Sequence, residues 1–351
     1  MEFAQSPIIL RSSASAMRAT LRGARWLTVL AGVLLLGLVF SRLSPAFLEF
    51  QNLKNIAVQS SVTGVMAVGM TFVIMTAGID ISVGAILYLT AALVGELAAS
   101  HASGASAILA YVVGIALGTA LGLMNGLVTT SLRINPLVTT LATLNIYRGL
   151  ALHINQANIT LVPDSARYFG IGTLASVPVP VLTMLAVGTI CALILRFTRF
   201  GRYVLAIGVS ERSARETHLP VNKVQVAVYG IAGACAGLGG LILLGRVGAV
   251  QSDMGIGIEF TVITAAVLGG TSLAGGRGSI VGTLLGAILL VMIDNGLNLM
   301  NASPYVYDIV RGGVLVSAIL IQGLPIGRQL RVWPPYLKPW LRQPKKAAPE
   351  N

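Results

Sequence analysis

A succession of long apolar stretches constrains this chain more than any other feature. The hydrocarbon core of a bilayer is about 30 Å thick, so a helix needs about 20 apolar residues to cross it. A window of that length finds ten stretches separated by short connections, near 26–42, 55–77, 81–99, 106–130, 136–153, 174–198, 223–245, 257–274, 278–299 and 304–323. The sequence therefore predicts an all-α, polytopic membrane protein with about ten transmembrane helices.

The distribution of charge predicts the orientation of these spans. Only 10% of the residues are charged, whereas a soluble globular domain has about 25%. Most of the 24 Lys and Arg residues fall in connections on the side where both termini lie, and such residues mark cytoplasmic loops. We therefore predict cytoplasmic termini, a basic segment 1–25, a transmembrane domain 26–325 and a basic tail 326–351. Since the basic residues lie at membrane edges, the lipid bilayer is the expected partner and nucleic acid is not.

Two halves of the chain share short sequence patterns. "GIDISV" at 78–83 is matched by "GIEFTV" at 257–262, and "LGTALGLM" at 117–124 by "VGTLLGAI" at 281–288. The matched spans cross the membrane in opposite directions in the topology above. Spans 2–5 and 7–10 are therefore predicted to form an inverted repeat, an arrangement typical of transporters. Chance similarity between glycine-rich apolar segments is the alternative.

An acidic residue, Asp80, lies between two apolar spans in "AGIDISVG" at 77–84. Its carboxylate is suited to an N-cap, where it accepts hydrogen bonds from free backbone amides and stabilises the positive end of the helix dipole. Glu259 has the equivalent place at the start of the eighth span. Two interpretations stay open. These helix ends lie near the interface, or they are recessed into the bundle, where intramembrane acids line a polar path.

Further polar side chains lie within the predicted spans. Each of them either forms a hydrogen bond or ion pair between helices, as Asp308 and Arg311 could do on one helix face, or lines a route for a polar, uncharged solute. The candidate residues of such a route are Asp80, Ser82, Asn125, Asn145, Arg148, Glu259, Thr261 and Asn295.

No catalytic, cofactor or metal site is predicted. The stretch "GTSLAGGRG" at 270–278 lacks the Lys-Ser/Thr pair that ends a phosphate-binding loop. Cys191 and Cys235 lie in apolar stretches without metal-ligand spacing. Any ATP would therefore be hydrolysed by a partner.

The longest basic connection, 196–224, carries charges of both signs. Its core at 201–217 predicts one short amphipathic helix, closed by Pro220. A helix lying on the membrane surface is one interpretation. A docking helix for another protein accounts better for the mixture of charges.

Several motifs together resemble the membrane permease of ribose-type ATP-binding-cassette sugar importers. They are "AGIDISVGA", "NPLVTTLATLNIYRGLAL", "GRYVLAIG" and "GIEFTVITAAVLGGTSLAGGRGSIVGTLLGA", and the resemblance covers about residues 50–325. It departs at Glu216 and His218, where the family tends to have an apolar residue and a glycine.

The resemblance implies a translocation path for a monosaccharide in a bacterial inner membrane. It also implies a second permease copy or a related permease, a cytoplasmic cassette ATPase that uses ATP, and a periplasmic sugar-binding protein. The segment 199–222 corresponds to the coupling loop of the family, with Gly201, Arg202, Glu211, Arg212, Ala214, Arg215 and Glu216 as the implied contact residues.

A secondary transporter driven by an ion gradient is the competing hypothesis. In that case Asp80 and Glu259 would bind a proton or sodium ion. The large basic loop disfavours this hypothesis, because a secondary transporter needs no docking site for an ATPase.

Overall fold

A computed structural model describes residues 25–100, 104–156 and 158–323. Apart from Arg25, the predicted segments 1–25 and 326–351 lie outside these residues. The long helices are α2 (Arg25–Leu43), α3 (Phe50–Met75), α4 (Val83–Ser100), α5 (Gly104–Ser131), α6 (Pro136–Asn155), α8 (Val179–Phe197), α11 (Val221–Val247), α13 (Ile280–Leu299) and α14 (Pro304–Gly323). Shorter helices are η1 (Pro45–Leu48), η2 (Asp164–Arg167), α7 (Tyr168–Ile171), α9 (Arg199–Val209), α10 (Glu211–Glu216) and α12 (Ile258–Leu268).

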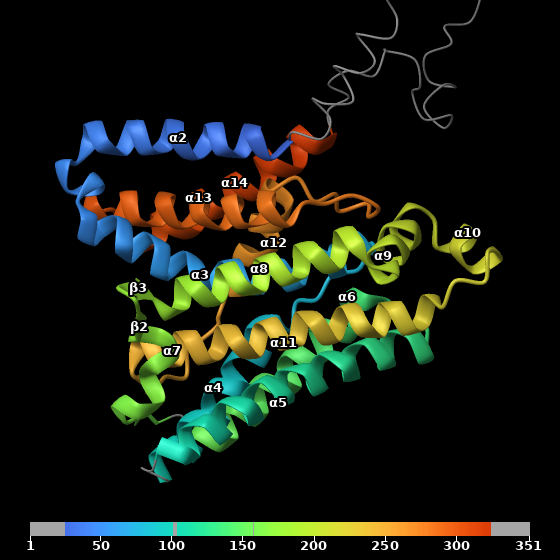
Figure 1. Ribbon diagram of the computed structural model, residues 1–351, viewed down its shortest axis with the longest axis horizontal. Coiled ribbons are helices and arrows are strands. Elements are labelled where there is room, and N and C mark those ends of the chain that lie inside the picture. Colours follow the sequence, from blue (N-terminus) through green and yellow to red (C-terminus); the bar gives the residue numbers. More distant parts are fainter. Residues whose placement is uncertain (1–24, 101–103, 157, 324–351) are drawn as a thin grey trace, which may run out of the picture.

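Strands make only a small contribution to the fold. β1 (Thr160–Leu161) pairs with β4 (Ala249–Val250), and β2 (Thr173–Leu174) pairs with β3 (Val177–Pro178), both antiparallel. The long helices run side by side, with the β2–β3 hairpin at one end of the bundle and α10 at the other (Figure 1). The chain is thus a helical bundle, as the sequence predicts.

A helix lies within each of the ten predicted stretches. Six of the described helices are both long and apolar enough to cross a membrane: Trp26–Leu43, Phe50–Met75, Val112–Ser131, Val179–Phe197, Val221–Val247 and Ile280–Leu299. Val83–Ala99 and Ile258–Leu268 are apolar but shorter. The protein is therefore a multi-pass membrane protein.

Three predicted boundaries are wrong, and the first of them is the start of the second stretch, because α3 begins at Phe50 instead of 55. The eighth stretch, 257–274, was expected to be helical throughout, but α12 ends at Leu268. Gly270 has a left-handed backbone with φ of 95°, and a Cβ at Gly269 would overlap the backbone of Gly282 on α13. The sixth stretch starts at Val179 instead of 174, because the β2–β3 hairpin occupies the preceding residues.

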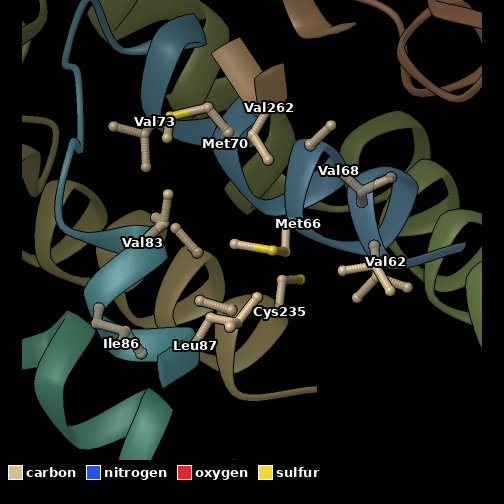
Figure 2. Packing of buried hydrophobic residues seen from close by; sticks show 14 of the residues in the cluster. Val62, Met66, Val68, Met70, Val73, Val83, Ile86, Leu87, Cys235 and Val262 are labelled. Atoms are coloured by element: carbon tan, nitrogen blue, oxygen red, sulfur yellow. The ribbon is translucent and has the colours of Figure 1, made fainter. Parts of the chain in front are cut away.

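The core surrounds α3, which is buried along most of its length. Met66 and Met70 of α3 pack with Leu87 of α4, Cys235 of α11 and Val262 of α12 (Figure 2). A buried hydrogen bond of 2.8 Å between the hydroxyls of Thr71 and Thr283 adds a polar link from α3 to α13. Helices α4, α11, α12 and α13 are thereby held around one central helix.

Glycines set the distance between α5 and α11. A Cβ on Gly118 of α5 would lie 2.5 Å from the carbonyl oxygen of Gly233 on α11 and 3.0 Å from the Cα of Gly237. A Cβ on Gly126 would lie 2.7 Å from the Cα of Val226. The backbones of the two helices are therefore in direct contact, an arrangement that glycine permits where lipid supplies no hydrophobic force between helices.

Candidate functional site

The segment between α3 and α4 carries Asp80 into the bundle. α3 ends in a Schellman turn, in which Gly78 donates to the carbonyl of Val73 (3.0 Å) and Ala77 to that of Ile74 (2.9 Å). Ala77 has the left-handed conformation of this turn, with φ of 60°. The chain then turns back, and Asp80 is fully buried three residues later.

Asp80 is not the N-cap residue that the sequence predicts, because α4 begins at Val83. Its Oδ1 accepts hydrogen bonds from the backbone amide (2.9 Å) and the hydroxyl (2.6 Å) of Ser82. The carbonyl of Ser82 accepts the amide of Ile86 and so opens the helix. The carboxylate thus fixes the turn that leads into α4. Asp80 lies two residues before Ser82, the residue that directly precedes the helix.

A chain of buried hydrogen bonds joins this turn to α5 and α6. Asn125 of α5 donates from Nδ2 to the hydroxyl of Ser82 (2.7 Å), and Tyr147 of α6 donates to Oδ1 of Asn125 (2.9 Å). Every donor in the chain is oriented toward Asp80, so its carboxyl group is the final acceptor. Sequence reasoning identified Asp80, Ser82 and Asn125 and missed Tyr147.

Two polar atoms near this chain accept or donate no hydrogen bond within the described residues. They are Oδ2 of Asp80 and the hydroxyl of Tyr229 on α11. Tyr229 faces the same segment, since a Cβ on Gly78 would lie 2.9 Å from its hydroxyl oxygen. Burying unpaired polar groups is costly, so packing within the described residues leaves this polar position without full hydrogen bonding.

The first turns of α4 and α12 meet inside the bundle. A Cβ on Gly84 of α4 would lie 2.5 Å from Oε2 of Glu259 and 2.5 Å from the carbonyl oxygen of Gly255. Glu259 is buried in the first turn of α12. The two helices therefore bring the positive ends of their dipoles, and one acidic residue each, to a common place.

Arg148 of α6 reaches the same region from the side. Its guanidinium donates to the carbonyl of Ser252 (3.0 Å), in the segment before α12, and lies 5.5 Å from the ring centroid of Tyr88 on α4. Thr261 donates to the carbonyl of Gly257 in the first turn of α12 (3.5 Å). Arg148 thus links α6 to α4 and to the segment that precedes α12.

Two of the candidate residues lie elsewhere. Asn145 is exposed and donates to the carbonyl of Leu141 on its own helix (2.9 Å). Asn295 exchanges two hydrogen bonds with Asn52 near the start of α3 (2.9 and 2.8 Å). Beside this pair, Arg311 of α14 donates to both carboxylate oxygens of Asp294 on α13 (3.1 and 2.7 Å). Asp308, the predicted partner of Arg311, contributes a longer ion pair of 3.7 Å.

The predicted single helix 201–217 is two helices, α9 and α10. Ser210 separates them in an extended conformation, and its hydroxyl accepts the amide of Ser213 as the N-cap of α10 (3.2 Å). A serine that caps a new helix competes with continuation of the old one. The prediction of one continuous helix was therefore wrong, although both pieces lie within the predicted loop.

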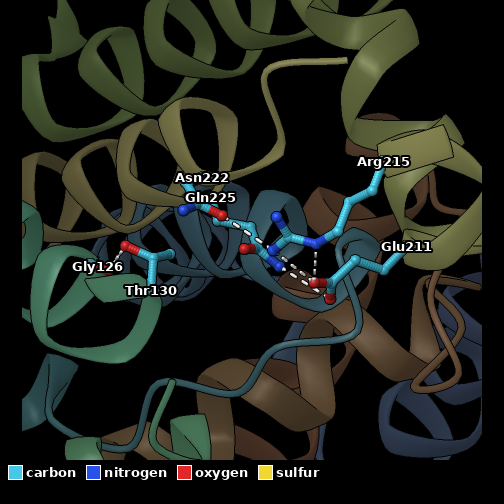
Figure 3. Close-up of polar contacts among 6 residues, drawn as sticks. All are labelled: Gly126, Thr130, Glu211, Arg215, Asn222 and Gln225. Atoms are coloured by element: carbon cyan, nitrogen blue, oxygen red, sulfur yellow. Dashed lines mark hydrogen bonds and ion pairs between the residues drawn. The ribbon is translucent and has the colours of Figure 1, made fainter. Parts of the chain in front are cut away.

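The coupling-loop residues are distributed over both helices. Gly201 is buried and Arg202 exposed on α9, whereas Ala214 is the buried residue of α10. Arg215 pairs with Glu211 (2.7 Å) and donates to Asn222 (2.9 Å), and Glu211 accepts from Gln225 of α11 (3.3 Å), as Figure 3 shows. Arg212 pairs with Glu216 at 3.1 Å on the open side of α10. α10 is thus fixed to the start of α11.

Fold and site together describe a multi-pass membrane protein with a polar centre inside its helical bundle. Residues 52–319 match the family described as the permease component of the branched-chain amino acid transport system. Within the described residues, no group of three or more His, Cys, Asp or Glu side chains is placed to hold a metal ion.

Individual relatives are similar over most of the chain. It is 39% identical to the ribose import permease protein RbsC of Escherichia coli (strain K12), over 83% of this chain and 92% of that protein. It is 41% identical to RbsC of Bacillus subtilis (strain 168), over 83% of this chain and 90% of that protein. It is 36% identical to the L-arabinose transport system permease protein AraH of Escherichia coli (strain K12), over 79% of this chain and 84% of that protein. No solved structure matches the chain.

The chain belongs to this family of transport-system permeases. Its predicted resemblance to ribose-type permeases is confirmed by these relatives. The protein is therefore a transport subunit.

Proposed function

We propose that this chain forms the membrane path of an ATP-driven monosaccharide importer. The observation that carries this proposal is the similarity to permeases named for ribose, D-allose and L-arabinose, at 36–41% identity over about four fifths of the chain. The family description names branched-chain amino acids, so these are the substrate class against which a sugar must be tested. A polar sugar suits a path in which hydroxyl and amide groups on Ser82, Asn125 and Thr261 lie beside the ionisable side chains of Asp80, Arg148 and Glu259.

The energy source in this proposal is a cassette ATPase that docks on α9 and α10. Both helices lie at one end of the bundle (Figure 1), and α10 exposes charges of both signs on Arg212 and Glu216. A sugar-binding protein would deliver the substrate at the opposite end. The chain itself would bind no nucleotide or other cofactor.

The topology in this proposal has ten spans, with both termini in the cytoplasm of a bacterial cell and the bundle in the inner membrane. The helical contacts support an inverted repeat of α3–α6 and α11–α14. α3 packs on α13 as α11 packs on α5, α4 contacts α5 as α12 contacts α13, and α4 contacts α6 as α12 contacts α14. Asp80 and Glu259 have corresponding places in the two halves.

The path in this proposal passes the recessed starts of α4 and α12. Asp80, Ser82, Asn125, Arg148, Glu259 and Thr261 gather there, whereas Asn145 and Asn295 do not. Asn145 faces outward from this single copy, where a second permease of the dimer would lie. An ion-driven transporter would use the same acids as ion ligands, but no observation on this chain favours it over the family.

One experiment tests the proposal directly. The chain is purified with the cassette ATPase and the sugar-binding protein of its transport system and reconstituted in vesicles. ATP hydrolysis and uptake are then measured with ribose, D-allose, L-arabinose and leucine. Stimulation of both by a sugar is expected. Stimulation by leucine alone, or uptake that follows an ion gradient without ATP, would refute it.

A further inference from the structure

Three backbone segments meet at the end of the bundle that carries α9. They are the Schellman turn after α3, the C-terminal end of α9, and the glycine-rich connection between α12 and α13. The amide of Gly276 donates to the carbonyl of Met75 (2.9 Å), one of the carbonyls that the end of α3 leaves without a helical partner. A hydrogen bond between backbones therefore ties the α12–α13 connection to the end of α3.

Glycines let these segments touch. A Cβ on Gly208 of α9 would overlap the carbonyl oxygen of Met75 and the amide nitrogen of Gly276. A Cβ on Gly275 would lie 2.7 Å from the carbonyl oxygen of Gly208 and 3.1 Å from the Cβ of Ala77. Side chains, which could absorb a displacement by rotating, are thus largely missing from the contact.

The connection between α12 and α13 is itself held in one shape. Gly275 donates to the carbonyl of Ser272 (2.9 Å), and Ser272 donates to that of Arg277 (3.0 Å). Gly275 and Gly276 have left-handed backbones, with φ of 81° and 71°, which only glycine adopts readily. The loop is therefore a stiff element against which α9 and α3 are both fixed.

α9 and α10 are firmly attached to this contact. The rings of Phe200 on α9 and Phe72 on α3 lie 6.2 Å apart, and Val204 and Ile207 are buried on the same helix. The amide of Ser210 still donates to Ala206 (3.2 Å) while its side chain caps α10. A displacement of α10 is therefore carried to Gly208.

On the other side, the contact leads to Asp80. Ala77 lies beside Gly275, where an added Cβ would come within 3.1 Å of the Cβ of Ala77. Ala77 precedes Asp80 by three residues, and the amide of Gly78 donates to the carbonyl of Val73. Because packed backbones transmit strain with little compliance, a shift at Gly208 or Gly275 moves the turn that positions Asp80 and Ser82 at the start of α4.

We propose that Gly208, Gly275 and Gly276 form a backbone junction that transmits movement of α9 and α10 to the Asp80 turn. These glycines are positioning residues for transport, since they act through the turn and do not touch the substrate. The inference rests on the proposed function, because it assumes that an ATPase moves α10.

The test uses Gly208→Ala in the complete complex of permease, ATPase and binding protein. Retained copurification of the ATPase and retained basal hydrolysis are expected. Sugar uptake per ATP hydrolysed should fall about tenfold, within the range that residues along a coupling route produce. The matched control is Gly37→Ala on α2, where a Cβ would meet only Cε of Met292 at 3.6 Å. The control should leave the ratio unchanged.

A second variant covers the case in which Gly208→Ala does not fold. Ala77→Gly places glycine at a left-handed position that glycine favours, so folding is retained while the Cβ that contacts Gly275 is removed. Uptake per ATP should fall about two- to fivefold. The junction is overturned if Ala77→Gly keeps the normal sugar uptake per ATP hydrolysed. It is also overturned if folded Gly208→Ala shows normal uptake or no longer copurifies with the ATPase. Failure of wild-type complex to couple any sugar to ATP instead refutes the proposed function.

Discussion

Asn125 donates a hydrogen bond of 2.7 Å to the hydroxyl of Ser82, a residue 43 positions earlier in the chain, and both side chains are fully buried. This contact joins α5 to the start of α4 and continues to Tyr147 on α6. The side chain of Asn125 therefore holds three helices together. Its Nδ2 donates to Ser82 and its Oδ1 accepts from Tyr147.

Replacing Asn125 by alanine should reduce stability markedly. Two buried hydrogen bonds would be lost, at about 0.5–1.5 kcal/mol each, while the hydroxyl of Ser82 keeps Asp80 and that of Tyr147 keeps the carbonyl of Leu121 as acceptor. Thermal unfolding in detergent measures the change. Asn298→Ala is the matched control, because this asparagine is exposed near the end of α13 and exposed substitutions stay within about 0.5 kcal/mol. Equal stability of the two variants would contradict the role of the chain of hydrogen bonds.

Asp80→Asn should keep most of the transport activity, whereas Asp80→Ala should lose it. Asparagine retains an oxygen that can accept from the amide and hydroxyl of Ser82, so the turn into α4 is preserved. Alanine removes that acceptor and leaves two buried donors unpaired, at a cost of about 1–3 kcal/mol. Uptake and expression level are measured for both. If Asp80→Asn folds but is as inactive as Asp80→Ala, the charge itself is required and an ion-binding role replaces the structural one.

Arg212→Glu should weaken association with the ATPase without affecting the fold. The side chain of Arg212 is 91% exposed, and its only ion pair among the described residues is the surface contact with Glu216, so the change in unfolding free energy should stay within about 0.5 kcal/mol. Adding Arg215→Glu should weaken association further. It should also reduce the stability of α10 locally, because Arg215 donates a hydrogen bond to Asn222. Copurification of the ATPase is the measurement. Arg42→Glu, at the predicted opposite side, is the control, and equal copurification of all variants would exclude α10 as the docking element.

Gly118→Ala should destabilise the bundle. The added methyl group would meet the backbone of Gly233 at 2.5 Å, and overpacking of this kind costs about 1–3 kcal/mol. Gly313→Ala on α14 meets no atom within 4 Å and should be neutral or stabilising, since alanine is the better helix former by about 1 kcal/mol. Unfolding temperatures of the two variants give the comparison. Similar values would show that α5 and α11 separate easily to admit a side chain.

The positions of the long helices could be predicted because each apolar run is close to the length that crosses a bilayer. The early end of α12 could not, because "GGTSLAGG" after Leu268 carries no charge and only two small hydroxyl side chains, and the stop comes from contact with Gly282. The break at Ser210 depends on a choice between two local hydrogen-bonding patterns that have nearly equal propensity.

For the candidate site, the acids and amides could be identified because polar atoms are rare in apolar spans. Tyr147 and Tyr229 could not, since a tyrosine in a span fits the apolar pattern until its hydroxyl is located. The separation of Asn295 from Asp80 could not be predicted either, because it depends on how the helices pack. The helical period shows which residues share a face of one helix, but not which neighbouring helix that face contacts.

The close contact of α5 with α11 has a consequence for biosynthesis. The end of α5 at Ser131 precedes the end of α11 at Val247 by 116 residues, and a ribosome adds about 5–20 residues per second. For roughly 6–23 s, α5 therefore resides at the translocation machinery with its row of glycines facing lipid or a chaperone. A polypeptide released before α11 emerges keeps that surface open, which makes it the kind of product that membrane proteases remove.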